Sequence, residues 1–449
     1  QMGHYDTPST FGRQRIFSYI CVNKYESMSA TKIKIRLLPL CIFLLMIWLA
    51  PAGAPAQNTA RDTITGDDGW KFSLVTCAPG SEIYQLEGHT ALRATHSGGV
   101  DLAINWGVFD FAAPNFVYRF VKGETDYMAA AYPFHMFLEE YRREGRRVVE
   151  QELNLSPGQA EELMRLVEEN LRAENRTYRY NYVKDNCATR PLALIERATG
   201  SEINLASTPA SGTDEAAPTF RSEMTSYHAA YPWYQFGIDI ALGAGIDNPV
   251  TERERTFAPV RLQSALQDAT FTAPDGTALP VVKATNILVE GDPAGTADSA
   301  TPWPITPMAI GVDLLVITLV FSFFDIRRRK LSRWLDTLIF GAQFLAGCLL
   351  TFLIFVSVHE ATSPNWLYLW LNPLCVIAAA GVWIKRWKRV VYWYQICNFA
   401  ALTILLSAHH FFGQALNAAF PMYILCALMR SGTDIYVLRS QLHGTGGKH

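Results

Sequence analysis

The sequence lacks a strong net charge. It carries 39 basic and 41 acidic side chains over 449 residues, which gives a net charge of −2 at pH 7. Nucleic-acid-binding domains concentrate positive charge on one surface, so this near balance argues against a nucleic-acid partner. The length exceeds that of one ordinary domain and predicts at least two.

Cysteine is also scarce outside the apolar runs. Of eight cysteines, only Cys77 and Cys187 lie between residues 57 and 306. No CxxC or HExxH pattern accompanies them, and two cysteines alone cannot form a zinc site. We therefore expect no metal and no cofactor. Two interpretations of the pair stay open: a disulfide, or a reactive thiol at Cys187.

The N-terminal 56 residues resemble an export signal preceded by a tag or an upstream extension. From Met28 the chain has a basic start, an apolar run over Leu37–Leu49 and small residues at Ala54-Pro55-Ala56. This pattern is typical of a secretory signal peptide, and a retained membrane anchor is the alternative. Residues 57–250 are then expected to form an exported catalytic domain.

Five apolar runs dominate the C-terminal part. Each can cross the hydrocarbon core of a membrane as a helix, although the last is short. Lys and Arg follow the first, third and fifth runs, whereas the other two loops have neither. The positive-inside rule therefore places the C-terminus in the cytoplasm and the exported domain on the opposite side of the membrane. The runs are Met308–Ile326, Leu335–Val358, Leu367–Ile384, Val391–Ala408 and Gln414–Met429.

The composition predicts three further boundaries. Residues 251–306, which are rich in Ala, Thr, Pro and Asp, are expected to form a linker or a periplasmic subdomain. Residues 307–430 are expected to form the transmembrane domain. Residues 431–449 are then a cytoplasmic tail.

A predicted β-hairpin and a predicted helix carry the chemically informative residues. Two β-rich runs flank Ser97-Gly98-Gly99, and a turn centred near Ser97 places His89 opposite Asn105. Cys187 precedes a helix that stops at Gly200, and a helix start favours a thiolate. A thiol, an imidazole and an amide form the papain-type arrangement, with Cys187 as nucleophile, His89 as base and Asn105 as orienting residue. A structural disulfide remains the alternative.

Several other polar residues are secondary candidates. Asp101 competes with Asn105 as the residue that orients the histidine. Four residues beside the cysteine are expected to support its turn or an oxyanion hole: Asp185, Asn186, Thr189 and Arg190. Four others are candidates for contact with a lipid headgroup or the membrane face, or else ordinary interfacial polarity: His359, Glu360, Arg119 and Lys122.

Longer motifs resemble one family. The segments TCAPGSEIYQLEGHTALR, INWGVFDFAAPNFVYRFVKGETDY, GRRVVEQELNLS and NRTYRYNYVKDNCATRP occur in this order in the exported part. HEATSPNWLYLWLNP and GQALNAAFPMYI follow in the membrane part. Together they are similar to the Lnb-type lipoprotein N-acyltransferases, whose exported domain was formerly a domain of unknown function. The resemblance covers nearly the whole chain after the signal peptide.

The resemblance implies a fold and a reaction. The implied fold is an α+β, permuted papain-like domain, as in the NlpC/P60 and lecithin:retinol acyltransferase groups, followed by an all-α five-helix transmembrane domain. The implied reaction moves an acyl chain from a membrane phospholipid to the α-amine of the diacylglyceryl cysteine of a lipoprotein. It proceeds through an acyl-thioester on Cys187, with His89 and Asn105 in the roles above. The alternatives are a papain-like peptidase or amidase acting on peptidoglycan, and a non-catalytic membrane scaffold.

Overall fold

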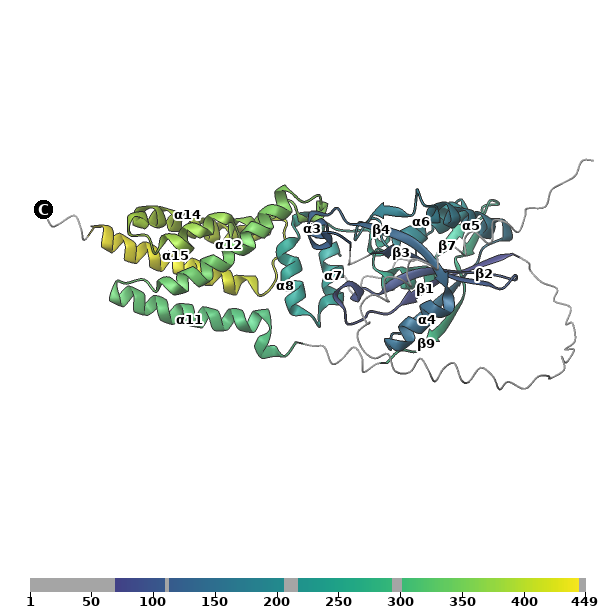
Figure 1. The fold of residues 1–449 in the computed structure, drawn as a ribbon, viewed down its shortest axis with the longest axis horizontal. Helices are drawn as coiled ribbons and strands as arrows, with labels where there is room; N and C mark the ends of the chain where they lie inside the picture. The colour runs from purple at the N-terminus through teal and green to yellow at the C-terminus, as the bar shows by residue number, and fades with distance from the viewer. Residues whose placement is uncertain (1–68, 110–112, 206–216, 293–300, 444–449) are drawn as a thin grey trace, which may run out of the picture.

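A computed structural model describes residues 69–109, 113–205, 217–292 and 301–443, so the predicted signal peptide lies outside the described residues. An α+β sheet domain (residues 69–292) precedes a helical domain (residues 301–443). Figure 1 shows the two domains end to end along the long axis of the molecule.

One seven-stranded antiparallel sheet organises the sheet domain, in the order β6-β4-β3-β2-β1-β5-β9. Successive side chains along its strands point to opposite faces, and both faces are buried. Leu74 and Val75, which are neighbours on β1, belong to different apolar clusters. The strands are β1 (Trp70–Cys77), β2 (His89–His96), β3 (Val100–Val108), β4 (Asp126–Pro133), β5 (Val148–Leu153), β6 (Thr177–Arg179) and β9 (Val282–Val289), with a separate hairpin of β7 (Thr270–Thr272) and β8 (Ala278–Pro280).

Helices cover both faces of this sheet. The larger core lies under α5 (Pro157–Leu171), α6 (Thr189–Thr199) and α10 (Pro259–Gln267). The smaller core lies under α4 (Phe134–Arg143), whose Phe137 is fully buried. Burying one such side chain contributes about 1.5–3 kcal/mol, so both layers hold the central strands in place.

Local residues set the start of α5 and the end of α6, and α6 stops at Gly200 as the sequence predicts. Ser156 caps α5, because its hydroxyl accepts a hydrogen bond from the Gln159 amide at 3.4 Å, and Pro157 takes the first helical position. α6 ends at Gly200, whose φ of 72° lies in the left-handed region that glycine adopts without strain. Cys187 lies two residues before α6.

Residues 251–289 are an integral part of the sheet domain rather than a linker. β9 pairs with β5 and forms one edge of the sheet, while Leu262 and Leu266 of α10 enter the larger core. The predicted boundary after residue 250 therefore falls inside the sheet domain. The short apolar stretches of this region are buried only by strands that are distant in the sequence. The composition of the region, taken alone, therefore resembles that of a linker.

One of the remaining helices of the sheet domain adjoins the helical domain. Phe236 of α8 (Pro232–Ala241) packs on Phe420 and Tyr423 of the helical domain, with ring centroids 5.1 and 5.3 Å apart. The other elements are α3 (Phe116–Lys122), α7 (Phe220–His228), α9 (Glu252–Arg255), η1 (Ile83–Gln85) and η2 (Ala244–Asp247).

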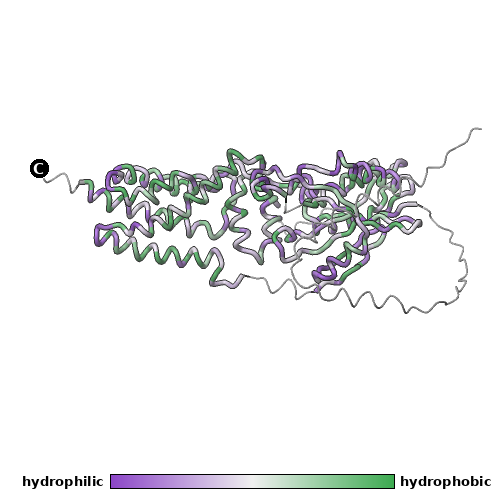
Figure 2. Tube along the Cα trace, viewed as in Figure 1, coloured by the Kyte–Doolittle hydropathy of each residue, from purple (hydrophilic) through white to green (hydrophobic). Residues whose placement is uncertain are grey.

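Three helices of the helical domain are long and apolar enough to cross a membrane, namely Pro307–Arg328, Arg333–Phe355 and Lys385–Phe412. Figure 2 shows hydrophobic residues along much of their length. The third predicted span is not one continuous helix. It is divided into η5 (Trp366–Leu369), η6 (Pro373–Cys375) and α13 (Val376–Gly381), because Pro373 lacks an amide hydrogen and the Asn372 side chain caps a new turn.

The last helix is longer than predicted. α15 runs over Phe420–His443, and the predicted boundary at residue 430 falls inside it. The fully buried Arg430 pairs with Asp336 at 2.6 Å and with Asp325 at 2.9 Å, so its charge is compensated inside the bundle. The other elements are α11 (Pro307–Arg328), α12 (Arg333–Phe355), α14 (Lys388–Ala408), η3 (Trp303–Ile305), η4 (Glu360–Thr362), η7 (Lys385–Trp387) and η8 (His409–Phe412).

Candidate functional site

His89 and Asn105 meet on the face of the sheet that α4 covers. The His89 Nε2 atom lies 2.9 Å from the Asn105 Oδ1 atom. Asn105 pairs with Ala91 rather than with His89, so the predicted register is wrong by two residues. A shift of two residues keeps both side chains on the same face, which is why the contact survives. Since Oδ1 can only accept, Nε2–H donates, and Nδ1 is the nitrogen that can accept a proton.

A turn built around Asn186 presents Cys187. The Asn186 Oδ1 atom accepts the amides of Ala188 at 2.8 Å and Thr189 at 3.0 Å, while its Nδ2 donates to the carbonyls of Tyr182 and Phe257. The Asn186 amide in turn donates to the Thr189 hydroxyl at 2.8 Å. Asn186 and Thr189 thus hold the turn together through these hydrogen bonds. Their amides are committed, which leaves them out of an oxyanion hole in this arrangement.

Asp185 and Arg190 brace the same turn from outside. Their ion pair joins the residues on either side of the cysteine, with Arg190 Nη2 donating to Asp185 Oδ2 at 2.8 Å. The guanidinium carbon of Arg190 also lies 3.4 Å from the centroid of the Tyr178 ring, a cation–π contact. The ion pair and the cation–π contact therefore brace the turn.

Burial sets the protonation state of Cys187. Burial is the largest influence on the thiol and raises its pKa from 9.0 to about 11. The backbone amides of Thr90 and of Cys187 itself, with the Tyr180 hydroxyl, lower this pKa without cancelling the effect of burial. The expectation that the helix start favours a resting thiolate is therefore wrong: desolvation outweighs the helix terminus. Because Thr90 follows His89, the sulfur lies at the end of β2 that carries the histidine.

The raised pKa of Cys187 predicts slow alkylation. At neutral pH a thiol with a pKa of about 11 contains about 100-fold less thiolate than one with a pKa of 9. The rate of carbamidomethylation at Cys187, followed by peptide mass spectrometry, should therefore rise with pH up to about 11. A rate that levels off below pH 8 would contradict the dominance of burial.

Cys77 lies beside the site as a second thiol. It pairs with His89 across β1 and β2, is fully buried and, like Cys187, is not in a disulfide. Burial is the main cause that raises its pKa. Because its neighbours are the apolar residues under α4, Cys77 is a core residue and remains protonated at neutral pH.

Asp101 is turned to another partner. Its two carboxylate oxygens accept hydrogen bonds from Arg93 at 2.8 and 2.9 Å, and Arg93 also contacts Glu150. It pairs with Thr95, farther along the hairpin from His89. Of the two sequence-predicted orienting residues, Asn105 is the one that contacts the histidine.

A buried polar chain links this site to the membrane helices. The His228 ring nitrogens lie 2.7 Å from Glu87 Oε1 and 2.7 Å from Gln235 Oε1, and Tyr182 donates to Glu87. Gln235 donates to Asp239, which accepts from Asn417, just before α15. Sequence reasoning missed these residues, since Glu87 and His228 are 141 positions apart. No local motif in either segment indicates this contact.

The four predicted membrane-face residues mostly contact other parts of the protein. His359 lies 2.9 Å from the Phe120 carbonyl, and Glu360 forms an ion pair with Lys184, three residues before Cys187. Arg119 pairs with Asp126 at 2.9 Å and Lys122 with Glu124 at 2.7 Å. His359 and Glu360 therefore join the end of α12 to the sheet domain.

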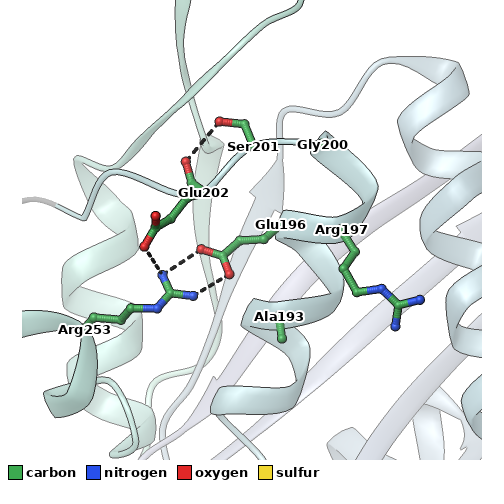
Figure 3. Close-up of a pocket in the computed structure, with 7 residues that line it drawn as sticks. All are labelled: Ala193, Glu196, Arg197, Gly200, Ser201, Glu202 and Arg253. Atoms are coloured by element: carbon green, nitrogen blue, oxygen red, sulfur yellow. Dashed lines mark hydrogen bonds and ion pairs between the residues drawn. The ribbon is translucent and has the colours of Figure 1, made fainter.

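A separate surface pocket lies at the opposite end of α6. Figure 3 shows Arg253 reaching the Glu196 carboxylate, with Gly200 and Ser201 at the rim. Two hydrogen bonds join Arg253 to Glu196, at 2.7 and 2.5 Å. This charged pocket lies along the C-terminal half of α6, and the Arg253–Glu196 ion pair is part of its lining.

These features define a membrane protein with an extramembrane α+β domain. At one end of β2 this domain holds a buried thiol, Cys187, and a hydrogen-bonded imidazole–amide pair, His89 and Asn105. Two family models match the chain: the Lnb N-terminal periplasmic domain over residues 67–221 and the Lnb transmembrane domain over residues 299–441. The chain belongs to the Lnb family, which implies lipoprotein N-acylation and a periplasmic sheet domain. Searches of curated proteins and of solved structures each found no significant match.

Proposed function

We propose that this protein transfers an acyl chain from a membrane phospholipid to the α-amine of a diacylated lipoprotein through an acyl-thioester on Cys187. The proposal rests on the arrangement at one end of β2. There His89 is hydrogen-bonded to Asn105, and the Cys187 thiol lies near the β2 backbone. Thiol, imidazole and amide are the groups that a papain-like acyl transfer needs. The sheet domain would then be a permuted papain-like fold.

The first half-reaction acylates the enzyme. His89 Nδ1 takes the Cys187 proton as the sulfur forms a bond to the ester carbonyl carbon. The ester C–O bond then breaks, and the lysophospholipid oxygen leaves with the proton from His89. Because the resting thiol has a raised pKa, proton transfer and attack must be coupled. Asn105 holds the Nε2–H tautomer throughout and stabilises the imidazolium.

The second half-reaction returns the thiol. The lipoprotein amine nitrogen forms a bond to the thioester carbonyl, its proton passes through His89 to the sulfur, and the C–S bond breaks. The product is an amide, which is more stable than the ester that supplied the chain, so no ATP, CoA or other cofactor is needed. The backbone amide of Cys187 is our candidate donor to the oxyanion, because the next two amides are held by Asn186.

The distribution of basic residues supports the orientation. Arg327 and Arg328 end α11, Lys385 lies between α13 and α14, and Arg439 lies in the last part of α15. Figure 1 shows the far ends of α11 and α15 at the end of the molecule away from the sheet domain. The positive-inside rule puts that end in the cytoplasm of a bacterium, with the C-terminus, and the sheet domain in the periplasm beside the inner membrane.

A reconstituted transfer assay tests the proposal. The full chain in phospholipid vesicles is mixed with a synthetic diacylated lipopeptide that has a free N-terminal amine, and the peptide is analysed by mass spectrometry. We expect one added acyl chain, attached through an amide. A peptide with a blocked amine is the control and should stay unchanged. Cleavage of a peptidoglycan stem peptide without transfer to the lipopeptide would instead identify an amidase.

Replacing Asn105 should slow the reaction without abolishing it. Asn105→Ala removes one hydrogen bond to the histidine, which predicts a loss of about 10- to 100-fold in the rate of transfer. The matched control is Asp101→Asn, which disturbs the pair with Arg93 and should change the rate by less than about threefold. A larger loss in the Asp101 variant than in the Asn105 variant would reverse the assignment of the orienting residue.

A further inference from the structure

α3 exposes apolar side chains where the sheet domain meets the membrane helices. Val117 is 72% exposed, and Tyr118 and Phe120 of the same helix are also exposed. The two basic residues of α3 pair with acidic residues of their own domain. Helices that present large apolar side chains outward while their charges are satisfied are typical of a surface that contacts lipid or a partner.

The surface is continuous with a membrane-spanning helix. The Tyr118 ring packs on Phe352 of α12 with centroids 6.1 Å apart, and the Val358 amide donates to the Lys122 carbonyl at 2.9 Å. Phe355 at the end of α12 is 69% exposed. Figure 1 shows α3 at this junction. Since the helical domain lies in the bilayer, the occupant that this continuity favours is the outer leaflet.

A row of aromatic rings connects α3 to the reactive thiol. It starts at Tyr180, whose hydroxyl lowers the pKa of Cys187, and the Tyr180 and Tyr127 rings stack with centroids 4.4 Å apart. The next centroid distances are 5.1 Å from Tyr127 to Phe109, 5.9 Å from Phe109 to Phe116 and 6.0 Å from Phe116 to Phe120. The row passes through buried Tyr127 and ends at exposed Phe120.

Gly107 keeps the inner end of this row close to the site. Its φ of 88° lies in the left-handed region, and a Cβ atom there would stand 3.2 Å from the Tyr180 ring. A side chain at this position would press on the ring that neighbours the nucleophile.

We propose that α3 lies in the outer leaflet and that a phospholipid acyl chain leaves the bilayer along this aromatic row to reach Cys187. The inference rests on the proposed function for the identity of the reaction. Moving methylene groups from the bilayer into water is unfavourable in proportion to chain length, and contact with a row of aromatic side chains would reduce that exposure. The ring contacts give the route a direction, from the exposed end at Phe120 to the thiol.

Photo-crosslinking locates α3 independently of catalysis. The full chain carrying benzoylphenylalanine in place of Val117 is irradiated in phosphatidylethanolamine–phosphatidylglycerol vesicles, and adducts are identified by mass. The matched control places the same residue at Ile287, an exposed apolar position on β9. We expect at least about tenfold more phospholipid adduct at position 117. Equal labelling at the two positions overturns the location of α3, even if the enzyme is active.

Kinetics test the route. Val117→Asp should lower acylation of Cys187 by vesicle phospholipid at least about tenfold, with Ile287→Asp within about twofold of the unmodified protein. Phe109→Ala should slow a hexadecanoyl donor at least about fivefold more than a hexanoyl donor, because only the long chain spans the row. An equal loss with both donors would mean that Phe109 is only structural and would overturn the route. If no donor acylates the unmodified protein, the proposed function fails, while the crosslinking result still decides the position of α3.

Discussion

Cys187→Ala is expected to lose N-acyl transfer by at least about a thousandfold, because the variant lacks the sulfur that is proposed to form the thioester. The Cys187 sulfur lies near the Thr90 backbone, next to His89, and follows a turn whose backbone amides are held by Asn186. The measurement is the initial rate of lipopeptide acylation in vesicles. Cys187→Ser should be nearly as inactive, since a hydroxyl is a much weaker nucleophile than a thiol.

Cys77→Ala is the matched control for the nucleophile. Cys77 is fully buried and belongs to the apolar cluster under α4. We expect its replacement to cost a few kcal/mol of stability at most and to leave the transfer rate within about fivefold. Equal inactivation of both variants, together with a Cys77–Cys187 bridge in non-reducing peptide maps, would favour a structural disulfide and the scaffold interpretation.

His89→Ala is expected to reduce the rate by about 100- to 10,000-fold, the range that a positioned general base contributes. The thiol has a raised pKa, so without a neighbouring base it stays protonated at neutral pH. The residual rate of the variant should increase with pH toward about 11, because hydroxide then generates the thiolate that the histidine no longer forms. A rate profile of the variant between neutral and alkaline pH measures both effects.

His96→Ala is the matched control for the base. His96 lies at the other end of β2, where its Nδ1 accepts the Gly98 amide in the hairpin turn. Its removal should leave transfer within about twofold. If His96→Ala were as damaging as His89→Ala, the effect would belong to the hairpin and not to proton transfer.

Local sequence patterns predicted much of the site. Gly200 marks the end of the helix after Cys187 through its backbone preference, which short-range physics determines. The glycines after Ser97 likewise identify the hairpin. The register was wrong by two residues because the pairing begins directly at His96 and Val100, a detail set by the turn geometry. Because the error is an even number of residues, the prediction that His89 and Asn105 share one face of the sheet was still correct.

Long-range features could not be read from the sequence. Hydropathy ends a span at Arg430, but Asp325 and Asp336, about a hundred residues earlier, neutralise it inside the bundle. The same limit hid the contact of Glu87 with His228. The pKa of Cys187 was predicted in the wrong direction, because the helix start is local whereas desolvation depends on every element that packs around the thiol.

The acyl-thioester is the most direct test of the account. The full chain is incubated with phospholipid vesicles and no lipopeptide, and its intact mass and its Cys187 peptide are measured. The account predicts one acyl group on Cys187, which hydroxylamine removes and which disappears when the diacylated lipopeptide is added as the peptide gains one chain. A lipopeptide that gains its chain while Cys187 is never acylated, or an acyl group on a different residue, would contradict it.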